Sequence, residues 1–477
     1  MQITKQYFND QQMTDMNSLM RAMVLKPAEL SPTITHLAGR QEKMFPLSTL
    51  TEGVGNVDRV KGAKGIDQVE YQYRVTTKIT QSRPLAETNS GNELGRGGQP
   101  FELVFPDKWF IRQYILISQS GVQVRIMSDP VPKGSNYAYT VQLVKPDEDL
   151  YLPSEDAEGG RLFGMMFAPV GQDFSRGNAS NWSSPSIVRH KLTTIRKSYQ
   201  LSGLANDAVA AFPLPAKGGG TSLFWMDYEE YQKWLRWMAE CELFYWYAEQ
   251  SYTEGGVTVM RDENGQPVTI GPGLLQQIVN KDTYSILTEK KLENTIGDLF
   301  YGMTDGQNKT VTLFTGTGGM REFDRAIKNK LSADSYRQFN DGKFVSGSGH
   351  EMALTGFFSR YEHVDGHTVN VVKVPLFDHG PVADARAKHP ETNYSLESYR
   401  MVFVDQTNYE GEPNLLMVYK KGREFLRWGV AGSTVPRGFK ESDLRASDVD
   451  GASVHFLKQA GICLKRFDTS LDLICTP

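Results

Sequence analysis

The chain has 477 residues, of which 39% are hydrophobic, so it can bury several cores and fold as about three domains. Its 52 lysines and arginines nearly balance 56 aspartates and glutamates, which gives a formal charge of −4. This balance argues against a nucleic-acid-binding protein, because such proteins usually carry a basic domain or surface. No apolar stretch reaches the roughly 18 residues that a membrane-spanning helix needs, and no signal peptide is expected.

Residues 1–60 are predicted to form an extended arm. Several methionines lie on one face of a short helix after Asp10, and Pro27 ends that helix. Further prolines, Pro32 and Pro46, favour an extended backbone beyond it. An arm with so little apolar content cannot fold alone, so we expect it to lie on another surface.

Residues 61–118 carry the pattern of a long β-hairpin. Apolar and polar residues alternate within 69–79 and again within 101–117, and each run predicts a strand with one apolar face. The stretch between them, 83–100, is rich in Gly and Asn, which predicts a flexible, polar tip. A long hairpin is marginal by itself, so we expect it to project onto another subunit. The candidate contacts are the charged residues of the tip, Arg83, Glu87, Glu93 and Arg96.

Residues 119–221 are predicted to be rich in β-strands. Apolar and polar residues alternate at 122–126 and again at 137–143, and prolines between the two runs predict turns. The region ends in Lys217 followed by three glycines, which predicts a flexible joint before the next element.

Residues 227–252 predict one long amphipathic helix. Asp227 is a suitable N-cap, and Glu230 three residues later completes a capping box. Apolar residues then recur at spacings of three and four, and Gly255 and Gly256 follow them. At about 1.5 Å per residue the helix would be roughly 39 Å long. It is either a buried core helix or the backbone of an elongated domain, with other elements along its length.

After this helix the pattern mixes helices with strands. Helices are predicted at 288–300 and 321–331, with a buried strand and a glycine turn at 311–319 between them. From residue 354 onward the pattern is β again. The predicted elements there are strands at 369–374, 401–404, 415–419 and 462–467, a strand or short helix at 453–460, and a helical piece near 441–445.

The sequence offers few candidates for chemistry. Residues 315–319, TGTGG, lack the spacing of a dinucleotide fingerprint and the Gly-Lys-Ser/Thr of a P-loop, so a tight glycine turn is the simpler explanation. His363 and His367 flank a turn and have no cysteine nearby, which argues against zinc. We therefore expect no catalytic residue, no cofactor and no metal. The three cysteines, which build no disulfide framework and fit a reducing cytoplasm, are Cys241, Cys463 and Cys475.

A modest basic patch lies near the end of the chain. It consists of Lys420, Lys421, Arg423 and Arg427, beside two aromatic residues. The simpler interpretation is a solvated face, and the alternative is a charged contact with a neighbouring subunit. The sequence alone leaves both open.

The order of these parts resembles the major capsid proteins of tailed bacteriophages, which have the Hong Kong 97 fold. Three strings sharpen the resemblance, because they are similar to segments of the major capsid proteins of crAss-like phages. The strings are LTEKKLENTIGDL at 287–299, LFTGTGGMREFDRAI at 313–327 and RWGVAGSTVPRGF at 427–439. The resemblance covers most of the chain and is weakest at 119–221.

The resemblance implies an α+β capsid fold of five parts. Residues 1–60 would be the N-terminal arm, 61–118 the extended loop that lies over a neighbouring subunit, and 119–221 a β-rich peripheral region or insertion. Residues 222–285 would form the peripheral domain with the spine helix 227–252. Residues 286–477 would be mainly the axial domain, with strands that return to the peripheral domain.

The resemblance also implies a structural protein rather than an enzyme. The chain would self-assemble as pentamers and hexamers into an icosahedral shell around the double-stranded DNA genome of a tailed phage, without sequence-specific binding. Expected partners are other copies of the chain, auxiliary or head-fibre proteins, a scaffold and a portal, with assembly in the host cytoplasm and residence in the virion. Two alternatives stay open, an encapsulin-like compartment shell and a carbohydrate-active or carbohydrate-binding β-rich protein.

Overall fold

The computed structural model describes most of the chain after residue 62. The described residues are 45–47, 63–76, 82–145, 147–180, 184–202, 214–215, 221–222, 225–303, 309–331, 338–339, 358–362, 366–409, 411–433, 435 and 444–477. Most of the predicted arm, the glycine joint after Lys217 and the side chain of the predicted cap Asp227 lie outside this description. The chain divides into two compact units, residues 72–188, called the barrel unit below, and residues 1–71 with 189–477, called the main unit.

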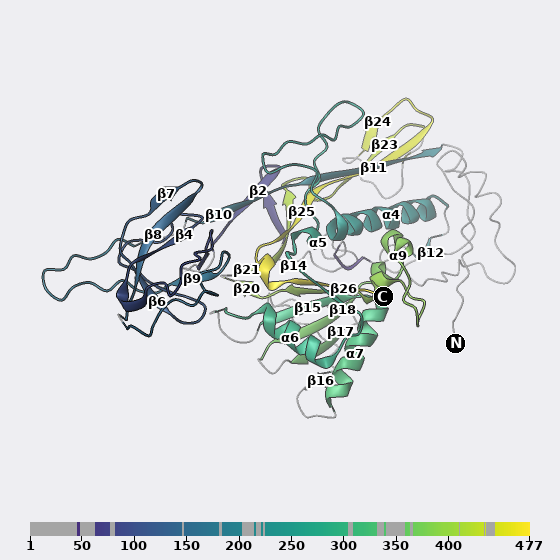
Figure 1. The fold of residues 1–477 in the computed structure, drawn as a ribbon. Helices are drawn as coiled ribbons and strands as arrows, with labels where there is room; N and C mark the ends of the chain where they lie inside the picture. Colours follow the sequence, from purple (N-terminus) through teal and green to yellow (C-terminus); the bar gives the residue numbers. More distant parts are fainter. Residues whose placement is uncertain are drawn as a thin grey trace. The chain divides into compact units, whose positions relative to one another are not determined.

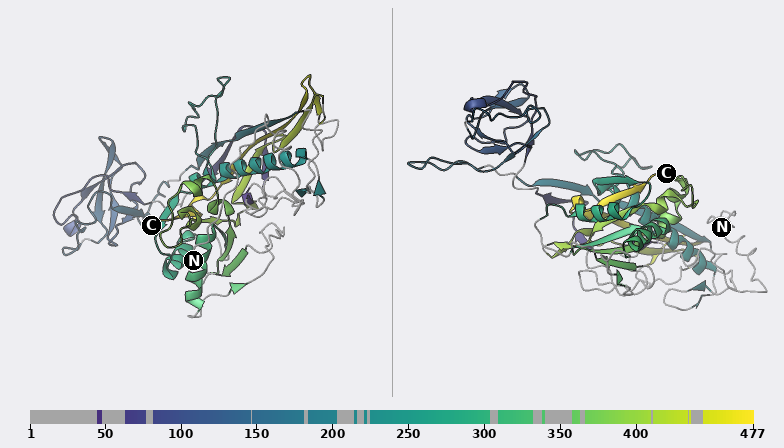
Figure 2. Two further views of the ribbon diagram at one scale, coloured as in Figure 1. Left: turned by 90° about the vertical axis from the view of Figure 1, so that its right-hand side faces the viewer. Right: turned by 60° about the horizontal axis from the view of Figure 1, so that its bottom comes forward.

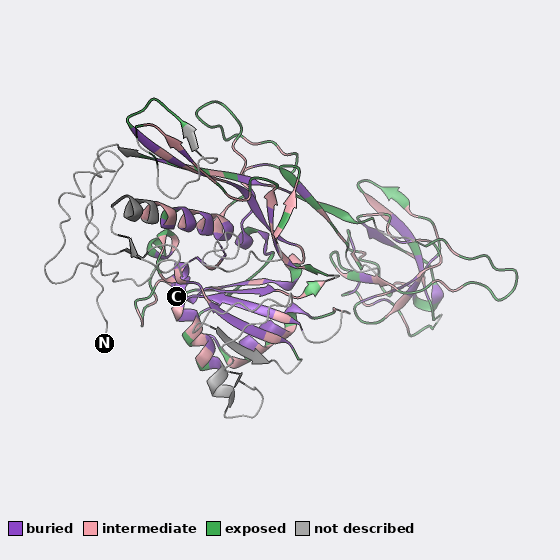
Figure 3. Ribbon diagram, turned by 180° about the vertical axis from the view of Figure 1, so that it is seen from behind, coloured by how far each residue is buried: buried purple, intermediate pink, exposed green. Residues whose placement is uncertain are grey.

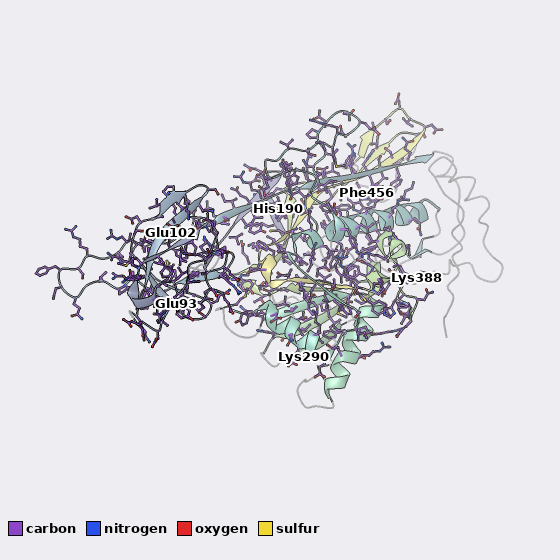
Figure 4. The ribbon with its side chains drawn as sticks, viewed as in Figure 1. Glu93, Glu102, His190, Lys290, Lys388 and Phe456 are labelled. Carbon is purple, nitrogen blue, oxygen red and sulfur yellow. The ribbon has the colours of Figure 1, made fainter. Side chains whose placement is uncertain are left out.

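The main unit is built around the helix α4 (Trp225–Tyr247), which lies between two β-sheets (Figures 1 and 2). One sheet has the strand order β1 (Ala63–Ile66), β22 (Leu415–Lys420), β25 (Gly451–Leu464), β23 (Leu426–Ala431) and β24 (Leu444–Ala446), and β11 (Thr193–Ser202) pairs with β25. Trp237 of α4 packs against Phe456 of β25, with ring centroids 5.7 Å apart. Phe456 is labelled in Figure 4. This side of α4 and the facing side of the sheet therefore form one apolar core.

The other sheet of the main unit covers the opposite side of α4. Its strand order is β14 (Asn280–Tyr284), β26 (Leu471–Cys475), β19 (Met401–Asp405), β15 (Thr310–Thr315), β18 (Thr368–Lys373), β17 (Phe358–Glu362) and β16 (Gln338–Phe339). Figure 3 shows its central strands buried along most of their length. Trp246 of α4 contacts Phe314 on one face, while helices α6 (Glu289–Leu299) and α7 (Thr317–Leu331) pack on the other. Alternate residues of one strand thus serve two cores.

A buried polar cluster fastens the end of α4 to the second sheet. Arg400 donates to both carboxylate oxygens of Asp472, at 2.8 and 2.6 Å, and to Glu397 at 2.8 Å. Tyr247, the last residue of α4, donates to the same Glu397 at 2.7 Å. Burial and the neighbouring Glu397 carboxylate raise the pKa of Tyr247, so its hydroxyl stays protonated and remains a donor. Since every charge here has a partner, the cluster fixes how the layers meet.

The long helix is confirmed, but it ends at Tyr247 rather than at residue 252. The reason is the segment that returns along the helix end. The amide of Gly273 donates to the carbonyl of Ala248 at 2.8 Å, and a Cβ on Gly273 would lie 2.8 Å from the Ala248 nitrogen. Only a glycine lets the two backbones come so close, and this contact caps the helix in place of the predicted glycines.

The barrel unit is a small β-barrel with its own core. Its strand order is β3 (Arg83–Pro84), β9 (Leu162–Met165), β5 (Ile115–Ile117), β6 (Gln123–Ile126), β8 (Asn136–Leu143) and β4 (Phe101–Phe105), and β7 (Val131–Lys133) also pairs with β8. The amide of Ala86 donates to the carbonyl of Val104 at 2.8 Å, which brings the chain after β3 back to β4. Phe105 is fully buried and meets Phe110, Tyr139 and Phe163 edge to face. Closure leaves few open strand edges.

The predicted hairpin between residues 69–79 and 101–117 is wrong in its pairing. The strand β2 (Glu70–Val75) pairs with β10 (Ser186–Lys191), whereas β4 pairs with β8. The predicted boundary between residues 118 and 119 falls inside the barrel sheet. Alternation reports that a strand is half-buried, but it does not say which strand lies beside it.

Most other elements follow the sequence pattern. The helix α6 begins where predicted, with the Thr288 hydroxyl accepting from the amide of Lys291 at 3.2 Å. Residues 444–446 form the strand β24 rather than a helix, while 441–443 lie outside the described residues. The predicted strand at 462–467 is the end of β25 and stops at Leu464, and a further strand, β26, follows it. The remaining short strands and α-helices are β12 (Leu214–Pro215), β13 (Thr221–Ser222), α5 (Leu274–Gln277), α8 (Pro375–Asp378), α9 (Pro381–Ala385), β20 (Asn408–Tyr409) and β21 (Glu412–Pro413). Short 3-10 helices lie at Arg96–Gly98, Leu396–Tyr399 and Phe467–Thr469.

The barrel core predicts a local loss of stability. Phe105→Ala should destabilise the barrel unit by about 3–5 kcal/mol, because it removes a fully buried ring among three aromatic neighbours. Hydrogen exchange read by mass spectrometry should show faster exchange across 82–168 and little change in α4. The control is Val131→Ala on β7, where the side chain is 59% exposed. Equal protection in the two variants would contradict a separate barrel core.

Candidate assembly site

The four charged residues predicted at a hairpin tip lie on the folded barrel unit (Glu93 is labelled in Figure 4). Their stretch is tied down by backbone hydrogen bonds, among them Asn89 N–H to Ala157 O at 2.9 Å and Leu152 N–H to Leu94 O at 2.8 Å. Leu85 is 2% exposed, and Leu94 packs against the barrel core. The predicted flexible tip is therefore wrong, because the buried Leu85 and the partly buried Leu94 anchor it.

Arg83 is engaged within the barrel unit. Its Nε donates to Asp107 Oδ2 at 2.7 Å, and its guanidinium lies 4.8 Å from the centre of the Trp109 ring. Only 25% of the side chain is exposed. Arg83 thus orders the turn after β4, and little of its charge is available to a neighbouring molecule.

Glu87 belongs to an exposed three-residue cluster. Lys133 lies 2.8 Å from Glu102 and 3.4 Å from Glu87, and each of the three side chains is about half exposed. The hydrogen bond to Glu102 raises the pKa of Lys133, despite some loss of solvation. The cluster carries one net negative charge on the surface of the barrel unit.

Glu93 and Arg96 are brought together as an ion pair, and each side chain is 49% exposed. Arg96 also donates to the carbonyl of Glu148 at 2.6 Å. The glycines around them are not loose: Gly95 and Gly97 have φ angles of 83° and 62°, which favour glycine. The two pairs, Glu87 with Lys133 and Glu93 with Arg96, therefore sit on an ordered surface. Their role in contacts between subunits stays a prediction.

The glycine-rich stretch after β15 holds a carboxylate where a phosphate would bind. Asp378 accepts from the amide of Thr317 at 2.7 Å and from its hydroxyl at 2.5 Å, and Ser398 Oγ accepts from the amide of Gly318 at 2.8 Å. A helix N-terminus attracts anions, and here the chain supplies its own. This arrangement argues against a nucleotide at the start of α7.

The predicted glycine turn and helix start are wrong by four residues. The helix α7 begins at Thr317 rather than at 321, so Gly318 and Gly319 lie in its first turn. A Cβ on Gly319 would lie 2.0 Å from Thr315 Oγ1, and one on Gly318 would lie 2.7 Å from the Tyr399 ring. The glycines are needed for close packing of the helix rather than for a turn.

Two of the histidines that cluster in sequence, His367 and His389, pack against aromatic rings. His367 is buried and packs at a tilt against Phe300, with ring centroids 4.6 Å apart, and His389 stacks on Tyr399 at 4.6 Å. His363 lies outside the described residues. Among the side chains that the structure describes, no three metal-binding groups lie together.

The chain matches one protein family over nearly its whole length. The Crassvirus major capsid protein family matches residues 1–476. The chain belongs to this family. It is 23% identical over 444 residues to the major capsid protein of Bacteroides phage crAss001, with 86% of each chain covered. The chain is thus a phage major capsid protein, a structural component of the virion that forms the shell.

Solved structures similar to this capsid protein have low sequence identity. The capsid of cyanophage P-SCSP1u is 8% identical and has a TM-score of 0.32, over 65% of this chain and 81% of that chain. The structure of Mycobacterium phage Patience is 10% identical and has a TM-score of 0.32, over 65% of this chain and 78% of that chain. The SrpI encapsulin complex of Synechococcus elongatus is similar as well, with 9% identity and a TM-score of 0.31 over 64% of this chain and 79% of that chain. With such TM-scores, the identification depends on family membership alone.

Several apolar side chains of this capsid protein are exposed, which the sequence pattern did not predict. Phe174, in the loop between β9 and β10, is fully exposed and has a φ of 51°. Val259, in the loop after α4, is 90% exposed. An exposed apolar side chain leaves water when another surface covers it, so both positions are candidates for contacts between proteins. The signal was a single aromatic within the polar stretch QDFSRG, and the string VTVM beside DENG.

The basic patch of the capsid protein is divided by the fold. Phe425 packs into the core 6.2 Å from Trp237, while Trp428 stacks on His455 at 5.1 Å and lies under Arg196. Lys421 is exposed and pairs with Asp67 at 3.1 Å.

Within the described part of the chain, no helix is long and apolar enough to cross a membrane.

The packing of α7 predicts an unusual sign for a glycine substitution. Replacing a helical glycine by alanine ordinarily stabilises a protein by roughly 1 kcal/mol. Gly319→Ala should instead destabilise this chain by about 1–3 kcal/mol, because the new methyl group overlaps Thr315. Thermal unfolding measures the change, and Gly177→Ala is the control, since no atom lies within 4 Å of its Cβ. A higher melting temperature for Gly319→Ala would show that the contact is not as described.

Proposed function

We propose that this major capsid protein assembles as pentamers and hexamers into an icosahedral shell of the Hong Kong 97 type, which encloses the double-stranded DNA of a tailed phage. The observation that carries the proposal is membership of a major capsid protein family over residues 1–476. Exposed apolar side chains such as Phe174 and Val259 support it, because isolated subunits gain by covering them. Heterologous contacts of this kind close into rings and shells without a catalytic pocket.

We assign the parts of the fold to capsid domains as follows. The helix α4 with the sheet of β25 would be the peripheral domain, and the seven-stranded sheet with α6 and α7 would be the axial domain. The strands β22, β23 and β25 are the late segments that return to the peripheral domain, which the order of elements supports. Phe45 and Leu47, near the end of the proposed arm, are buried in the core around α4.

We propose that the extended loop is the pair β2 and β10, with the barrel unit inserted in it. The chain enters the barrel unit by β2 and leaves it by β10, and these two strands pair. This moves the end of the loop from residue 118 to about residue 188. Glu87, Glu93 and Arg96 remain between 44% and 49% exposed, which supports a role as rim contacts with a neighbouring subunit.

The remaining partners follow from the resemblance to tailed-phage capsids. We propose auxiliary or head-fibre proteins, a scaffold and a portal as partners, and assembly in the host cytoplasm. The three cysteines are buried and form no disulfide with one another, which supports assembly in a reducing compartment. The formal charge of −4 supports enclosure of DNA without tight binding.

The proposal is tested by the size of the assembled protein. The purified full-length chain should form shells, or rings of five and six, in analytical ultracentrifugation and negative-stain microscopy. A variant in which a short Gly-Ser linker replaces residues 82–168 should lose these particles, because the proposed loop then lacks its inserted unit. Its far-UV circular dichroism should keep the helical signal, since the core around α4 is separate. A full-length chain that stays a monomer or dimer at high concentration, both alone and together with the proposed scaffold, would contradict the proposal.

A further inference from the structure

The chain after α4 forms a compact projection, residues 253–268, which we call the prong. Two isolated antiparallel β-bridges, Tyr252 with Thr258 and Arg261 with Pro267, each close a turn of this segment. The carboxylate of Asp262 accepts from the amides of Asn264 at 2.9 Å and Gln266 at 2.7 Å, which fixes the outer turn. The prong is therefore shaped before it meets any partner, so binding costs little ordering.

The prong presents apolar side chains to solvent. Val257 and Val259 are 65% and 90% exposed, and Met260 is 45% exposed (the outer part of this loop is green in Figure 3). Val257 and Val259 lie two residues apart on an extended segment, so they share one face. Three such side chains on an ordered projection have the form of an anchor for another protein surface.

The prong also carries an excess of negative charge. The prong holds three carboxylates, Glu254, Asp262 and Glu263, and one cation, Arg261. A second cation lies against it, since Lys191 donates to the carbonyl of Gly256 at 2.9 Å, and one net negative charge remains. Asp262 is used in the turn, and Arg261 donates to the carbonyl of Gly265 at 3.2 Å. Glu254 and Glu263 are exposed and remain as the charges that a partner would meet.

A surface of the opposite sign lies on the sheet of β25, on the side away from α4. Here Arg196, Leu457 and Leu426 form one row across β11, β25 and β23. Leu426 is 40% exposed and follows directly after the turn that holds Lys420, Lys421 and Arg423. We call this row with its turn the Leu426 face.

The charges of the Leu426 face sum to a positive value. Its four cations are Arg196 on the row and Lys420, Lys421 and Arg423 on the turn. Two carboxylates lie near them, Glu424 and the Asp67 that pairs with Lys421. Burial and the nearby Arg196 lower the pKa of His455 beside the row, so this histidine adds no charge near pH 7. The face thus joins exposed leucine to cations, as the prong joins exposed valine to carboxylates.

We propose that the prong of one copy of the chain docks on the Leu426 face of a second copy. This inference rests on the shell-forming function proposed above. Apolar contact would supply the attraction, and the opposite charges would set the orientation. Because the two surfaces differ, the contact is heterologous, so each copy can hold one neighbour and be held by another around a ring.

Charge reversal on each side tests the pairing. Glu254→Lys with Glu263→Lys should lower the particle yield at least tenfold, and so should Arg196→Glu with Arg423→Glu. Both changes place like charges together. A chain with all four substitutions should recover most of the yield, because the charges are exchanged rather than removed. Asp262 is left intact, since its carboxylate closes the turn. Equal melting temperatures would show that each variant is folded.

Cysteine crosslinking gives a second measurement that does not need closed particles. Val259→Cys in one chain and Leu426→Cys in another should form a disulfide-linked dimer when mixed, and much less when either is oxidised alone. The native cysteines are buried and should not compete. Dimers of Val259→Cys with itself, or no dimer, would overturn the pairing.

The outcomes separate this inference from the proposed function. If the unmodified chain forms shells but the reversed variants assemble equally well, or the fourfold variant does not recover, the prong does not dock on the Leu426 face. A prong that serves a different protein would give the first of these results. If the unmodified chain forms no particles at all, the proposed function fails and the pairing fails with it.

Discussion

The fold depends on one constraint, which is that α4 must be covered on two sides. Trp237 faces Phe456 of one sheet, while Trp246 faces Phe314 of the other, and both indoles are buried. A helix with apolar groups on opposite sides is stable in water only between two layers. The strands that cover it come from both ends of the chain, so the main unit closes only when the last strands are in place.

Stability within a subunit and contact between subunits depend on different groups of residues. The barrel unit buries Phe105 and its aromatic neighbours by itself, and the main unit fixes its layers through Arg400 and Asp472. Stability within a subunit therefore does not depend on the exposed groups. Val259 and Phe174 are left at the surface, where they can contact other proteins. A shell protein needs this separation, since its subunits must fold before they join.

Local elements could be predicted from the sequence, but their partners could not. Helical spacing located α4 and α6, and alternation located β4 and β8, because both periods report burial on one face. The pairing of β2 with β10 joins strands that are distant in sequence, and no local pattern encodes it. The candidate site was chosen for charge at a supposed flexible tip. Two leucines in that stretch, Leu85 and Leu94, pointed to a folded unit instead.

The most direct test of the account is a cryo-electron microscopy reconstruction of the particles that the purified chain forms. The account predicts a closed shell of pentamers and hexamers, with α4 between two sheets in every subunit and the barrel unit of each subunit in contact with a neighbour. Small discrete oligomers without a closed shell, or subunits in which one side of α4 faces solvent, would contradict it.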